Sequence, residues 1–501
     1  MFDFSGLKWI AECMGVPMWM VFITMMGSLY AVSSPSKSSL NKKTEKIATS
    51  GYANLRELKE FNKKSGIQLS KNFSLAEKYC FEHIAIIGPT GSGKTTSVFY
   101  PNLLQKESFS GGQSSIILTD PKGELFRDTS NFQKSLGREI VMFSPLEPQF
   151  SFKYNPLSYC ETSSEVSDLA MNILASGTKA MEITSGKTGG GSSEWLQMAS
   201  PLLASAMLYA WHQPRGLNTI SNAIDLILDS TDEQLKEVLG NSKFRDVQTQ
   251  FNIFNQASGS EKTASSIKIT LSSNLQLYTE DFMRELTSDN TYDLKTLRNK
   301  PTALYITYPE RHSAKIAPLL CVFFTQLINE LMKDENLKGN YLPIYFMFDE
   351  FANIGQIPNF ATLASTVRSR KMSFLCCLQS KNQLKNLYGN YDEDILANLK
   401  TKCVFGALQD IATTEYVSKL CGEVEIKTQS TSEREGKSDL GYNYSTTKKL
   451  LLTPDEVRRI EKDNILLLVQ NCKPYLDKTN TYYTQNKYIE NISTNFKKIS
   501  Y

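Results

Sequence analysis

Residues Ile84–Thr95 (IAIIGPTGSGKT) decide the fold of this chain of 501 residues. The apolar run Ile84–Ile87 ends at a Gly-Pro pair, which is typical of a buried strand in a parallel sheet. A Gly-x-x-x-x-Gly-Lys-Thr segment follows at once. Its glycines let backbone N–H groups wrap phosphates, and the helix that follows adds the positive end of its dipole. The stretch therefore predicts an α/β nucleotide-binding domain.

The same segment predicts which residues hold ATP and Mg²⁺. Lys94 is expected to reach the outer phosphates, and the Thr95 hydroxyl is expected to ligate Mg²⁺. The predicted nucleotide contacts are Gly88, Pro89, Thr90, Gly91, Ser92, Gly93, Lys94, Thr95 and Thr96. A second Gly-Lys-Thr, at 186–188, has Met181 where the first glycine would stand and no strand before it, so Ser185–Ser193 is predicted to be a flexible loop.

Two acids follow another apolar run, in the segment Ile344–Glu350 (IYFMFDE). A magnesium nucleotide site needs a carboxylate at the end of a second core strand, so Asp349 is expected to hold Mg²⁺ and Glu350 to polarise the attacking water. Taken alone, the pair also fits ordinary charges at a helix N-terminus. Gln379 follows the run Ser373–Leu378, where its amide would sense the terminal phosphate from a neighbouring strand.

Further core strands and a helical insertion are predicted between Lys94 and Asp349. Three apolar runs predict strands at 115–119, 139–143 and 302–307. Residues 160–262 show apolar residues at helical spacing, which predicts an all-α insertion domain. Its expected helices are Glu165–Ala175, Glu194–Trp211, Ile220–Leu228 and Asp232–Leu239, the last with a capping box of Ser230 and Glu233. Seven basic minus twelve acidic residues give this stretch a charge of −5, a poor surface for phosphate backbone.

The N-terminal part predicts a membrane anchor. Met14–Val32 holds 19 residues without a charge, enough for one helical span. Lysines follow the span, so the positive-inside rule places the rest of the chain in the cytoplasm. A cleaved signal peptide and an amphipathic surface helix are the alternatives. Residues 33–80 carry ten basic and four acidic side chains, which favours either contact with anionic lipid or a solvated linker.

Composition and charge restrict the other classes of function. The 55 Lys and Arg against 52 Asp and Glu leave no global basic field, so any nucleic-acid contact must be local. The nine cysteines lack zinc-site spacing and are interpreted as mostly buried reduced thiols, and the three histidines are too scattered for a metal cluster. Residues 428–447 are predicted to be an exposed loop, Thr453, Pro454 and Glu456 to begin a helix, and the chain after 482 to be a polar tail without order.

Together these segments resemble the coupling-protein family of conjugation and type IV secretion systems, the TraG/TraD-type membrane ATPases, within the HerA and FtsK-like motors. The resemblance runs through nearly all of the chain after the predicted span. Its specific segments are Asp120-Pro-Lys-Gly-Glu124, Asp349-Glu-Phe-Ala352 and Leu451-Leu-Thr-Pro454. Weaker ones are Gly51-Tyr-Ala53, Pro101-Asn-Leu-Leu104, Asn155-Pro-Leu157, the helix with Trp195, Glu261-Lys262, Leu304-Tyr-Ile306 and Leu378-Gln-Ser380.

The resemblance implies a RecA-like P-loop domain interrupted by an all-α domain. It implies a homo-hexamer, anchored in the bacterial inner membrane, that uses ATP to pass a relaxosome, DNA or an effector protein to inner-membrane components of the channel. The implied division is a 1–36 anchor, a basic 37–80 segment, a nucleotide domain of 81–159 and 263–480, an insertion of 160–262 and a polar tail of 481–501.

The chain departs from the family pattern in two places. Family members often have two spans, whereas one is predicted here. Where the family has Gly-Arg, this chain has Arg368-Ser-Arg370-Lys371, which leaves open which arginine, if either, reaches a neighbouring subunit's phosphate; a solvated basic helix end is the alternative. Asp120 is either a turn and capping residue or a carboxylate beside the magnesium. An FtsK-like DNA translocase and a nucleotide-binding docking scaffold without motor activity are the alternative functions.

Overall fold

The computed structural model describes residues 51–185, 192–337, 339–432 and 441–492. The described chain forms a large unit of residues 52–421 and 452–492 and a separate hairpin within 422–451. The predicted span at 14–32 and most of the predicted loop at 185–193 lie outside the described residues.

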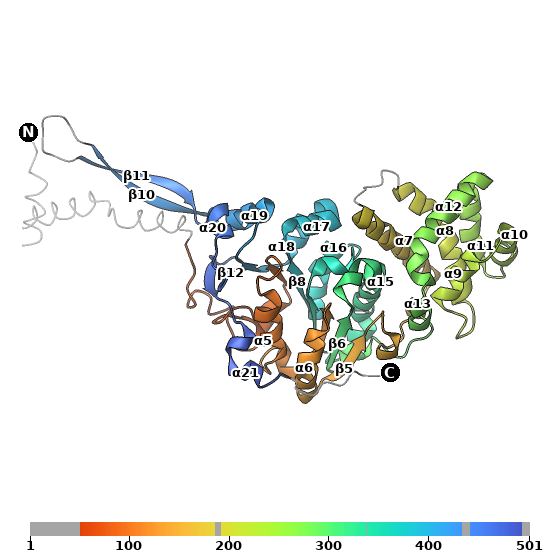
Figure 1. Cartoon of the computed structure of the whole chain (residues 1–501), viewed down its shortest axis with the longest axis horizontal. Coiled ribbons are helices and arrows are strands. Elements are labelled where there is room, and N and C mark those ends of the chain that lie inside the picture. Colours follow the sequence, from red (N-terminus) through yellow and green to blue (C-terminus); the bar gives the residue numbers. More distant parts are fainter. Residues whose placement is uncertain (1–50, 186–191, 338, 433–440, 493–501) are drawn as a thin grey trace, which may run out of the picture. The chain divides into compact units, whose positions relative to one another are not determined.

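A nine-stranded sheet forms the core of the large unit, in the order β13-β12-β9-β3-β8-β7-β4-β6-β5 (Figure 1). The strands from β9 to β5 are parallel, and β12 and β13 add an antiparallel edge. The six predicted strands are confirmed to within one residue at either end. The bounds are β3 Ile84–Ile87, β4 Ser115–Asp120, β5 Glu139–Phe143, β6 Thr302–Thr307, β7 Ile344–Phe348, β8 Met372–Leu378, β9 Thr401–Phe405, β12 Asn464–Val469 and β13 Tyr475–Lys478.

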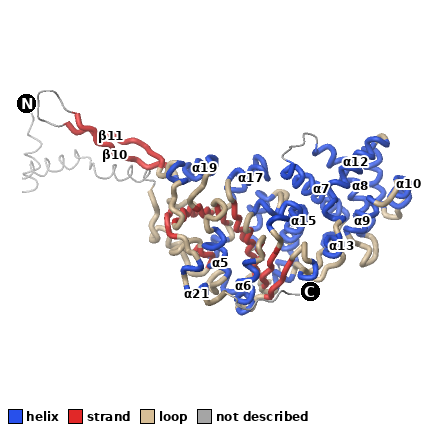
Figure 2. The backbone as a smooth tube through the Cα atoms, in the orientation of Figure 1, coloured by secondary structure: helices blue, strands red, loops and turns tan. Residues whose placement is uncertain are grey.

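Helices cover both faces of this sheet (Figure 2). Alternate residues of β7 point to opposite layers: Tyr345 and Met347 join the cluster beneath α5 and α6, whereas Phe348 packs edge-on against Phe324 of α15. The first layer contains α4 (Glu77–Cys80), α5 (Tyr100–Leu103), α6 (Glu124–Ser135) and α21 (Asn486–Ile489). The other elements of the sheet domain are α14 (Thr296–Asn299), α15 (Ser313–Met332), α16 (Phe360–Thr366), α17 (Lys381–Tyr388), α18 (Asp392–Asn398), α19 (Ile411–Cys421) and α20 (Pro454–Arg458).

The chain between β5 and β6 is helical, and this helical layer continues to Leu286, beyond the predicted limit of 262. It extends further because α12 packs on α7, α8 and α11 rather than on the sheet. The bounds are α7 Ser163–Ser185, α8 Ser192–Trp211, α9 Ile220–Leu228, α10 Asp232–Leu235, α11 Arg245–Ser258, α12 Glu261–Leu275 and α13 Asp281–Leu286.

The capping box of α10 differs from the predicted one by a single position. Thr231 and Gln234 form it, not Ser230 and Glu233. Both pairs have the required spacing, but Thr231 has the extended backbone of an N-cap, directly before the first helical residue. The predicted helix start at Thr453 and Glu456 is confirmed as a capping box with Pro454 in the first turn.

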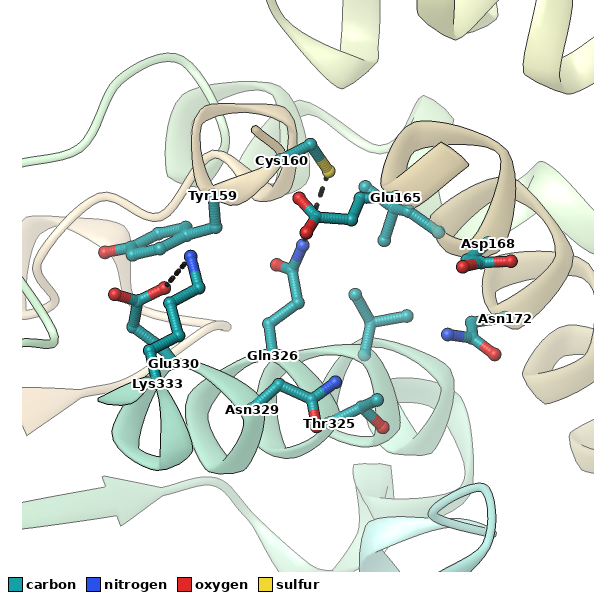
Figure 3. A pocket seen from close by; sticks show the side chains of 12 residues that line it. Tyr159, Cys160, Glu165, Asp168, Asn172, Thr325, Gln326, Asn329, Glu330 and Lys333 are labelled. Carbon is teal, nitrogen blue, oxygen red and sulfur yellow. Dashed lines mark hydrogen bonds and ion pairs between the residues drawn. The ribbon is translucent and has the colours of Figure 1, made fainter. Parts of the chain in front are cut away.

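A small polar cavity of about 130 Å³ lies where the helical layer meets α15 (Figure 3). Lys333 pairs with the buried Glu330 at 2.8 Å, and the Gln326 amide donates to the carbonyl of Pro156 at 3.0 Å. Burial raises the pKa of the Cys160 thiol there to about 12. The paired groups indicate a structural joint between the two layers.

The described residues were also compared with the length and hydropathy of a membrane-spanning helix. There, one helical stretch is long and apolar enough to cross a bilayer, Glu310–Met332. Most of it is buried inside the protein, as a core helix that covers the sheet.

The segment before β3 is not a linker from residue 52 onward, which corrects that alternative. It forms β1 (Gly66–Gln68) and β2 (Ser74–Ala76), paired antiparallel. Leu58, Ile67 and Phe73 are fully buried in the main core cluster. The basic residues between these apolar positions stay exposed, so the high local charge conceals a folded segment.

The tail prediction is wrong for residues 482–492, which are ordered against α5. Tyr482 stacks on Tyr100 with ring centroids 4.2 Å apart, and Tyr488 is fully buried. Two aromatic side chains anchor an otherwise polar segment, which composition alone does not reveal. Residues 493–501 lie outside the described residues.

Residues 428–432 and 441–447 of the predicted loop are instead strand residues of a β-hairpin, which corrects that interpretation for them, and residues 433–440 lie outside the described residues. Strands β10 (Glu423–Ser432) and β11 (Gly441–Leu450) pair antiparallel over their whole length. Thr recurs in both strands and Tyr recurs in β11, and these residue types favour extended backbone without apolar alternation.

Candidate nucleotide site

The loop after β3 has the backbone that phosphate binding requires. Gly91 and Gly93 have φ of 77° and 94°, a region that residues with a side chain rarely adopt. A Cβ on Gly88 would come within 2.8 Å of the Phe405 side chain on β9. The Lys94 ammonium donates to the carbonyls of Gly88 (2.7 Å) and Pro89 (3.1 Å). The loop is thus closed by the residue that would bind the outer phosphates.

The two predicted magnesium ligands meet in space although they are far apart in sequence. The Thr95 hydroxyl donates to Asp349, with both carboxylate oxygens at 3.1 Å. Burial raises the pKa of Asp349 to about 6, whereas the Thr95 hydrogen bond and the charges of Lys94 and Lys122 act to lower it. A hydroxyl and a carboxylate at this position are the oxygen ligands that Mg²⁺ prefers, so these residues fit the cation.

The predicted catalytic acid is held by two amides. Glu350 has a left-handed backbone (φ 75°), and its Oε2 accepts from Gln379 at 2.8 Å. Its Oε1 accepts from the Gln383 side-chain amide at 2.6 Å. The side-chain oxygen of Gln383, Oε1, in turn accepts from the Gln379 backbone N–H at 2.9 Å. Strand β8 lies between β3 and β7, so Gln379 follows the strand beside both halves of the site.

Gln383 was not found from the sequence. It lies in the first turn of α17, four positions after Gln379, behind the N-cap Ser380. That spacing places the two amides on one side of the strand-to-helix turn, but nothing in the sequence shows that they converge on a carboxylate from another strand.

The capping interpretation of Asp120 is confirmed, whereas its place beside the magnesium stays a prediction. Its carboxylate accepts from the Phe126 backbone N–H at 2.8 Å and so caps the start of α6. Burial, together with the charge of Asp349, raises the pKa of Asp120 to about 7. Asp120 therefore caps a helix and also feels the charge of the Asp349 carboxylate.

A second residue missed in the sequence, Tyr308, lies at this edge. It follows β6, whose last residue, Thr307, pairs with Asp120. Its side chain is only 3% exposed, and among the described residues its hydroxyl has no hydrogen-bond partner. Burial raises the Tyr308 pKa, and the charges of Asp349 and Glu350 add to this effect.

The structure does not bring Arg368 or Arg370 to this site. Both precede β8, at the opposite edge of the sheet from the loop after β3. Arg368 pairs with Glu82 at 2.6 Å and keeps 59% of its side chain exposed. Arg370 donates to the carbonyl of Met332 at 3.2 Å and so fastens the end of α15.

Fold and site together define an α/β P-loop nucleotide-binding protein. A family model described as "Type IV secretory system Conjugative DNA transfer" matches residues 36–500. The chain belongs to this family, as its motifs predict.

Named relatives agree with this assignment. Protein VirD4 of Agrobacterium fabrum is 27% identical over 414 residues, which is 80% of this chain and 59% of VirD4. Conjugal transfer protein TraG of Rhizobium radiobacter is 22% identical over 419 residues, which is 78% of this chain and 60% of TraG. The chain thus matches less than two thirds of the length of these relatives.

Solved structures share the fold. The plasmid coupling protein TrwB in complex with a non-hydrolysable ATP analogue superposes with a TM-score of 0.65 at 16% identity, covering 86% of this chain and 93% of TrwB. TrwB in complex with ADP and Mg²⁺ gives a TM-score of 0.64 at 15% identity, covering 87% and 94%.

Proposed function

We propose that this protein is a membrane-anchored, ATP-hydrolysing coupling protein that recruits DNA, nucleoprotein or protein substrate and feeds it to a type IV secretion channel. Its nucleotide domain is of the RecA-like kind, and its cofactors are ATP and Mg²⁺. The proposed setting is the bacterial inner membrane, with one span at 14–32 and the bulk of the chain in the cytoplasm. The active form is a homo-hexamer that binds inner-membrane components of the channel and a relaxase or effector.

One observation carries the hydrolytic part of the proposal: both Glu350 oxygens are held by amides beside the paired Thr95 and Asp349. Lys94 and the backbone of the loop would hold the phosphates, and Thr95 and Asp349 would hold Mg²⁺, which supplies charge stabilisation when bound. Glu350 would then orient water and take its proton. The amides of Gln379 and Gln383 fix the direction in which that carboxylate faces.

The docking-scaffold alternative does not account for this arrangement. A protein that only binds nucleotide needs Lys94 and Thr95, but it has no use for a carboxylate fixed on both oxygens next to the site. The FtsK-like alternative concerns the cargo rather than the chemistry, and the family match favours a coupling protein.

Replacing Glu350 by Gln tests the hydrolytic role. The change keeps the shape and one accepting oxygen, but it removes the proton acceptor and replaces the second accepting oxygen by an amide NH2. Because general bases contribute about 10²- to 10⁴-fold in rate, phosphate release should fall by that range while ATP affinity stays near that of the wild type. The measurements are steady-state phosphate release and equilibrium binding of a fluorescent ATP analogue on the full chain in detergent.

Glu233→Gln is the matched control, because Glu233 is an exposed acid of α10 in the helical layer. It should leave both quantities unchanged. If the Glu350→Gln variant hydrolyses ATP at the wild-type rate, another group is the catalytic base. If the variant neither hydrolyses nor binds ATP, Glu350 has a structural role.

A further inference from the structure

A basic groove lies on the large unit away from the nucleotide site. Its cavity volume is about 740 Å³. Five lysines from four separate segments line it together with a single carboxylate, that of Glu107, a local charge of 5 − 1 = +4. The five lysines are Lys63, Lys64, Lys71, Lys106 and Lys487, and the cavity that they line is here named the lysine groove.

The walls of the lysine groove are built from amides that already serve the fold. Asn62 donates to the Asn72 carbonyl at 3.1 Å, Gln105 donates to the Ser108 hydroxyl at 2.7 Å, and Asn491 donates to the Leu104 carbonyl at 2.9 Å. The Asn491 bond ties the chain after α21 to the end of α5, and the Gln68 backbone N–H, which donates to the Asn102 side chain at 2.8 Å, ties β1 to the same helix. The concave shape is therefore a fixed feature of the fold.

The ammonium groups, in contrast, are little used by the described part of the protein; that of Lys487 lies over the Tyr488 ring, 4.4 Å from its centroid. Among the described residues, none of the five lysines forms an ion pair with a carboxylate. All five are exposed. Like charges held together on a rigid frame repel one another, and an anion in the groove relieves that repulsion.

The groove lies at the N-terminal ends of the parallel strands, and the phosphate-binding loop after β3 lies at their C-terminal ends. Lys106 lies between the end of α5 and the start of β4, and Leu136 of the groove lies between the end of α6 and the start of β5. The Ala53 N–H donates to the Pro474 carbonyl at 2.7 Å, in the turn after β12. Val469 at the end of β12 pairs with the first residue of β9, so the chain from Ala53 toward Lys63 runs along this same edge.

The lining favours a lipid headgroup over nucleic acid. Single-stranded nucleic acid is held by aromatic platforms on which bases stack, whereas the one aromatic residue of the groove, Phe132, packs against the main core cluster. Every cation in the groove is a lysine, whose hydrated point charge suits a diffuse anionic surface. Leu104, Leu136 and Phe132 add an apolar margin beside the lysines.

We propose that the lysine groove binds the headgroup of an anionic phospholipid and so holds the N-terminal ends of the parallel strands against the membrane. This inference rests on the proposed anchor, since the residues that lead into the groove come from the predicted span at 14–32. The ligand class is a glycerol phosphodiester with net negative charge, such as phosphatidylglycerol.

The test is lysine footprinting of the full chain in lipid nanodiscs. Discs of phosphatidylcholine alone and discs with added phosphatidylglycerol are compared, and acetylation of each lysine is read by mass spectrometry. The five groove lysines should become several-fold less reactive in phosphatidylglycerol discs only. Lys262, an exposed lysine of the helical layer, should react equally in both.

Charge reversal supplies the second measurement. The double variant Lys71→Glu, Lys106→Glu should lose the protection, and its affinity for phosphatidylglycerol vesicles should fall by roughly fivefold for each lysine removed. Lys236→Glu, Lys262→Glu is the matched control, because both side chains are exposed on the helical layer. It carries the same charge change and should keep the protection.

Several outcomes would overturn the proposal. These are equal acetylation in the two kinds of disc, full protection by inorganic phosphate without lipid, or protection by a single-stranded oligonucleotide but not by phosphatidylglycerol. Failure of the chain to enter phosphatidylcholine discs refutes the anchor alone. In that case, binding of the chain to phosphatidylglycerol vesicles tests the groove independently of the anchor. If the chain does not bind these vesicles, the lipid-binding role of the lysine groove is refuted as well.

Discussion

At the scale of single residues, the position of Gln383 explains how a flexible acid acquires a fixed direction. A glutamate has three rotatable bonds, and Glu350 is directed by amides on both of its oxygens. Gln383 also accepts from the backbone N–H of Gln379, so the two amides form one unit. We therefore assign Gln383 as a positioning residue for the proposed catalytic acid.

Gln383→Leu should lower the turnover number about 10- to 100-fold, because a hydrogen bond to a charged group typically contributes about 1.5 to 3 kcal/mol. The dissociation constant for ATP should stay the same, since Gln383 does not line the phosphate loop. The check is phosphate release at saturating ATP beside nucleotide binding. Gln256→Leu, at an exposed position of α11, is the control. A variant that loses ATP binding in proportion to turnover would contradict the positioning role.

His83 makes folding stability depend on pH. Its Nδ1 accepts from the Phe374 N–H at 3.1 Å, and its Nε2 faces the Ala364 carbonyl at 2.5 Å. Burial lowers the pKa of His83 to about 4, below its ordinary value of 6.5. The folded state therefore prefers the neutral ring. The contribution of the neutral His83 ring to the free energy of unfolding is fully present above pH 6.5 and is lost as pH falls from 6.5 toward 4.

Between pH 7 and pH 5 the folded protein should lose about 2 kcal/mol of unfolding free energy through His83 alone, since each pKa unit corresponds to about 1.36 kcal/mol. Urea unfolding at the two pH values measures this loss. His83→Gln cannot take up a proton, so its stability difference between the two pH values should be smaller by that amount. His312→Gln, at a half-buried position of a surface turn, should retain the wild-type difference. The idea fails if His83→Gln shows the same acid sensitivity as the wild type.

At the scale of secondary structure elements, β10 and β11 form a hairpin whose ends already meet. The Leu451 N–H donates to the Gly422 carbonyl at 2.9 Å, and within the described residues each strand hydrogen-bonds to the other. An isolated two-stranded hairpin is marginally stable in water, so it contributes little to the fold of the large unit.

Replacing residues 424–449 by an Asn-Gly turn should therefore leave the melting temperature and ATP affinity unchanged. Differential scanning calorimetry and nucleotide binding check this directly. A matched deletion of β13, Tyr475–Lys478, removes an edge strand of the main sheet and should lower the melting temperature. A large fall for the hairpin deletion would show that the hairpin supports the core.

The elements also show how far the sequence alone determines this fold. Central strands of a parallel sheet are buried on both faces, so β3 and β7 appear as uninterrupted apolar runs and were predicted correctly. The hairpin was missed because its strands carry polar residues and, within the described ranges, pair only with each other. Glu350 was found from its place after a strand, whereas Gln383 and Tyr308 were not. The contact of Gln383 with Glu350 depends on the left-handed backbone of Glu350, and the place of Tyr308 depends on the strand order; a local pattern encodes neither.

At the scale of the whole molecule, the position of the two arginines bears on the proposed hexamer. Arg368 and Arg370 lie at the edge of the sheet opposite to Lys94, so neither serves the nucleotide of its own chain in this fold. Any phosphate that they reach belongs to another copy. Of the two, Arg368 is the more exposed, whereas Arg370 is committed to the carbonyl of Met332. Within the proposed hexamer we therefore assign the trans-acting role to Arg368.

Mixing two inactive variants tests this assignment. Lys94→Ala removes the phosphate contact of a subunit but leaves its Arg368 intact, and Arg368→Ala does the reverse. If the arginine acts on the neighbour's nucleotide, each preparation alone should be inactive. A one-to-one mixed ring should regain activity at the interfaces that combine an intact Lys94 with an intact Arg368, about a quarter of all interfaces in a closed ring of heterologous contacts.

The control for this mixture is Lys94→Ala with Glu350→Gln. Lys94 and Glu350 belong to the same nucleotide site, so no interface in that mixture carries both intact in one chain, and activity should stay at the level of the separate variants. Phosphate release after co-refolding or co-expression gives the readout, and light scattering confirms that both mixtures assemble alike. Recovery with Arg370→Ala but not with Arg368→Ala would transfer the role to Arg370. Recovery with neither, in rings of normal mass, would mean that hydrolysis is completed within each chain.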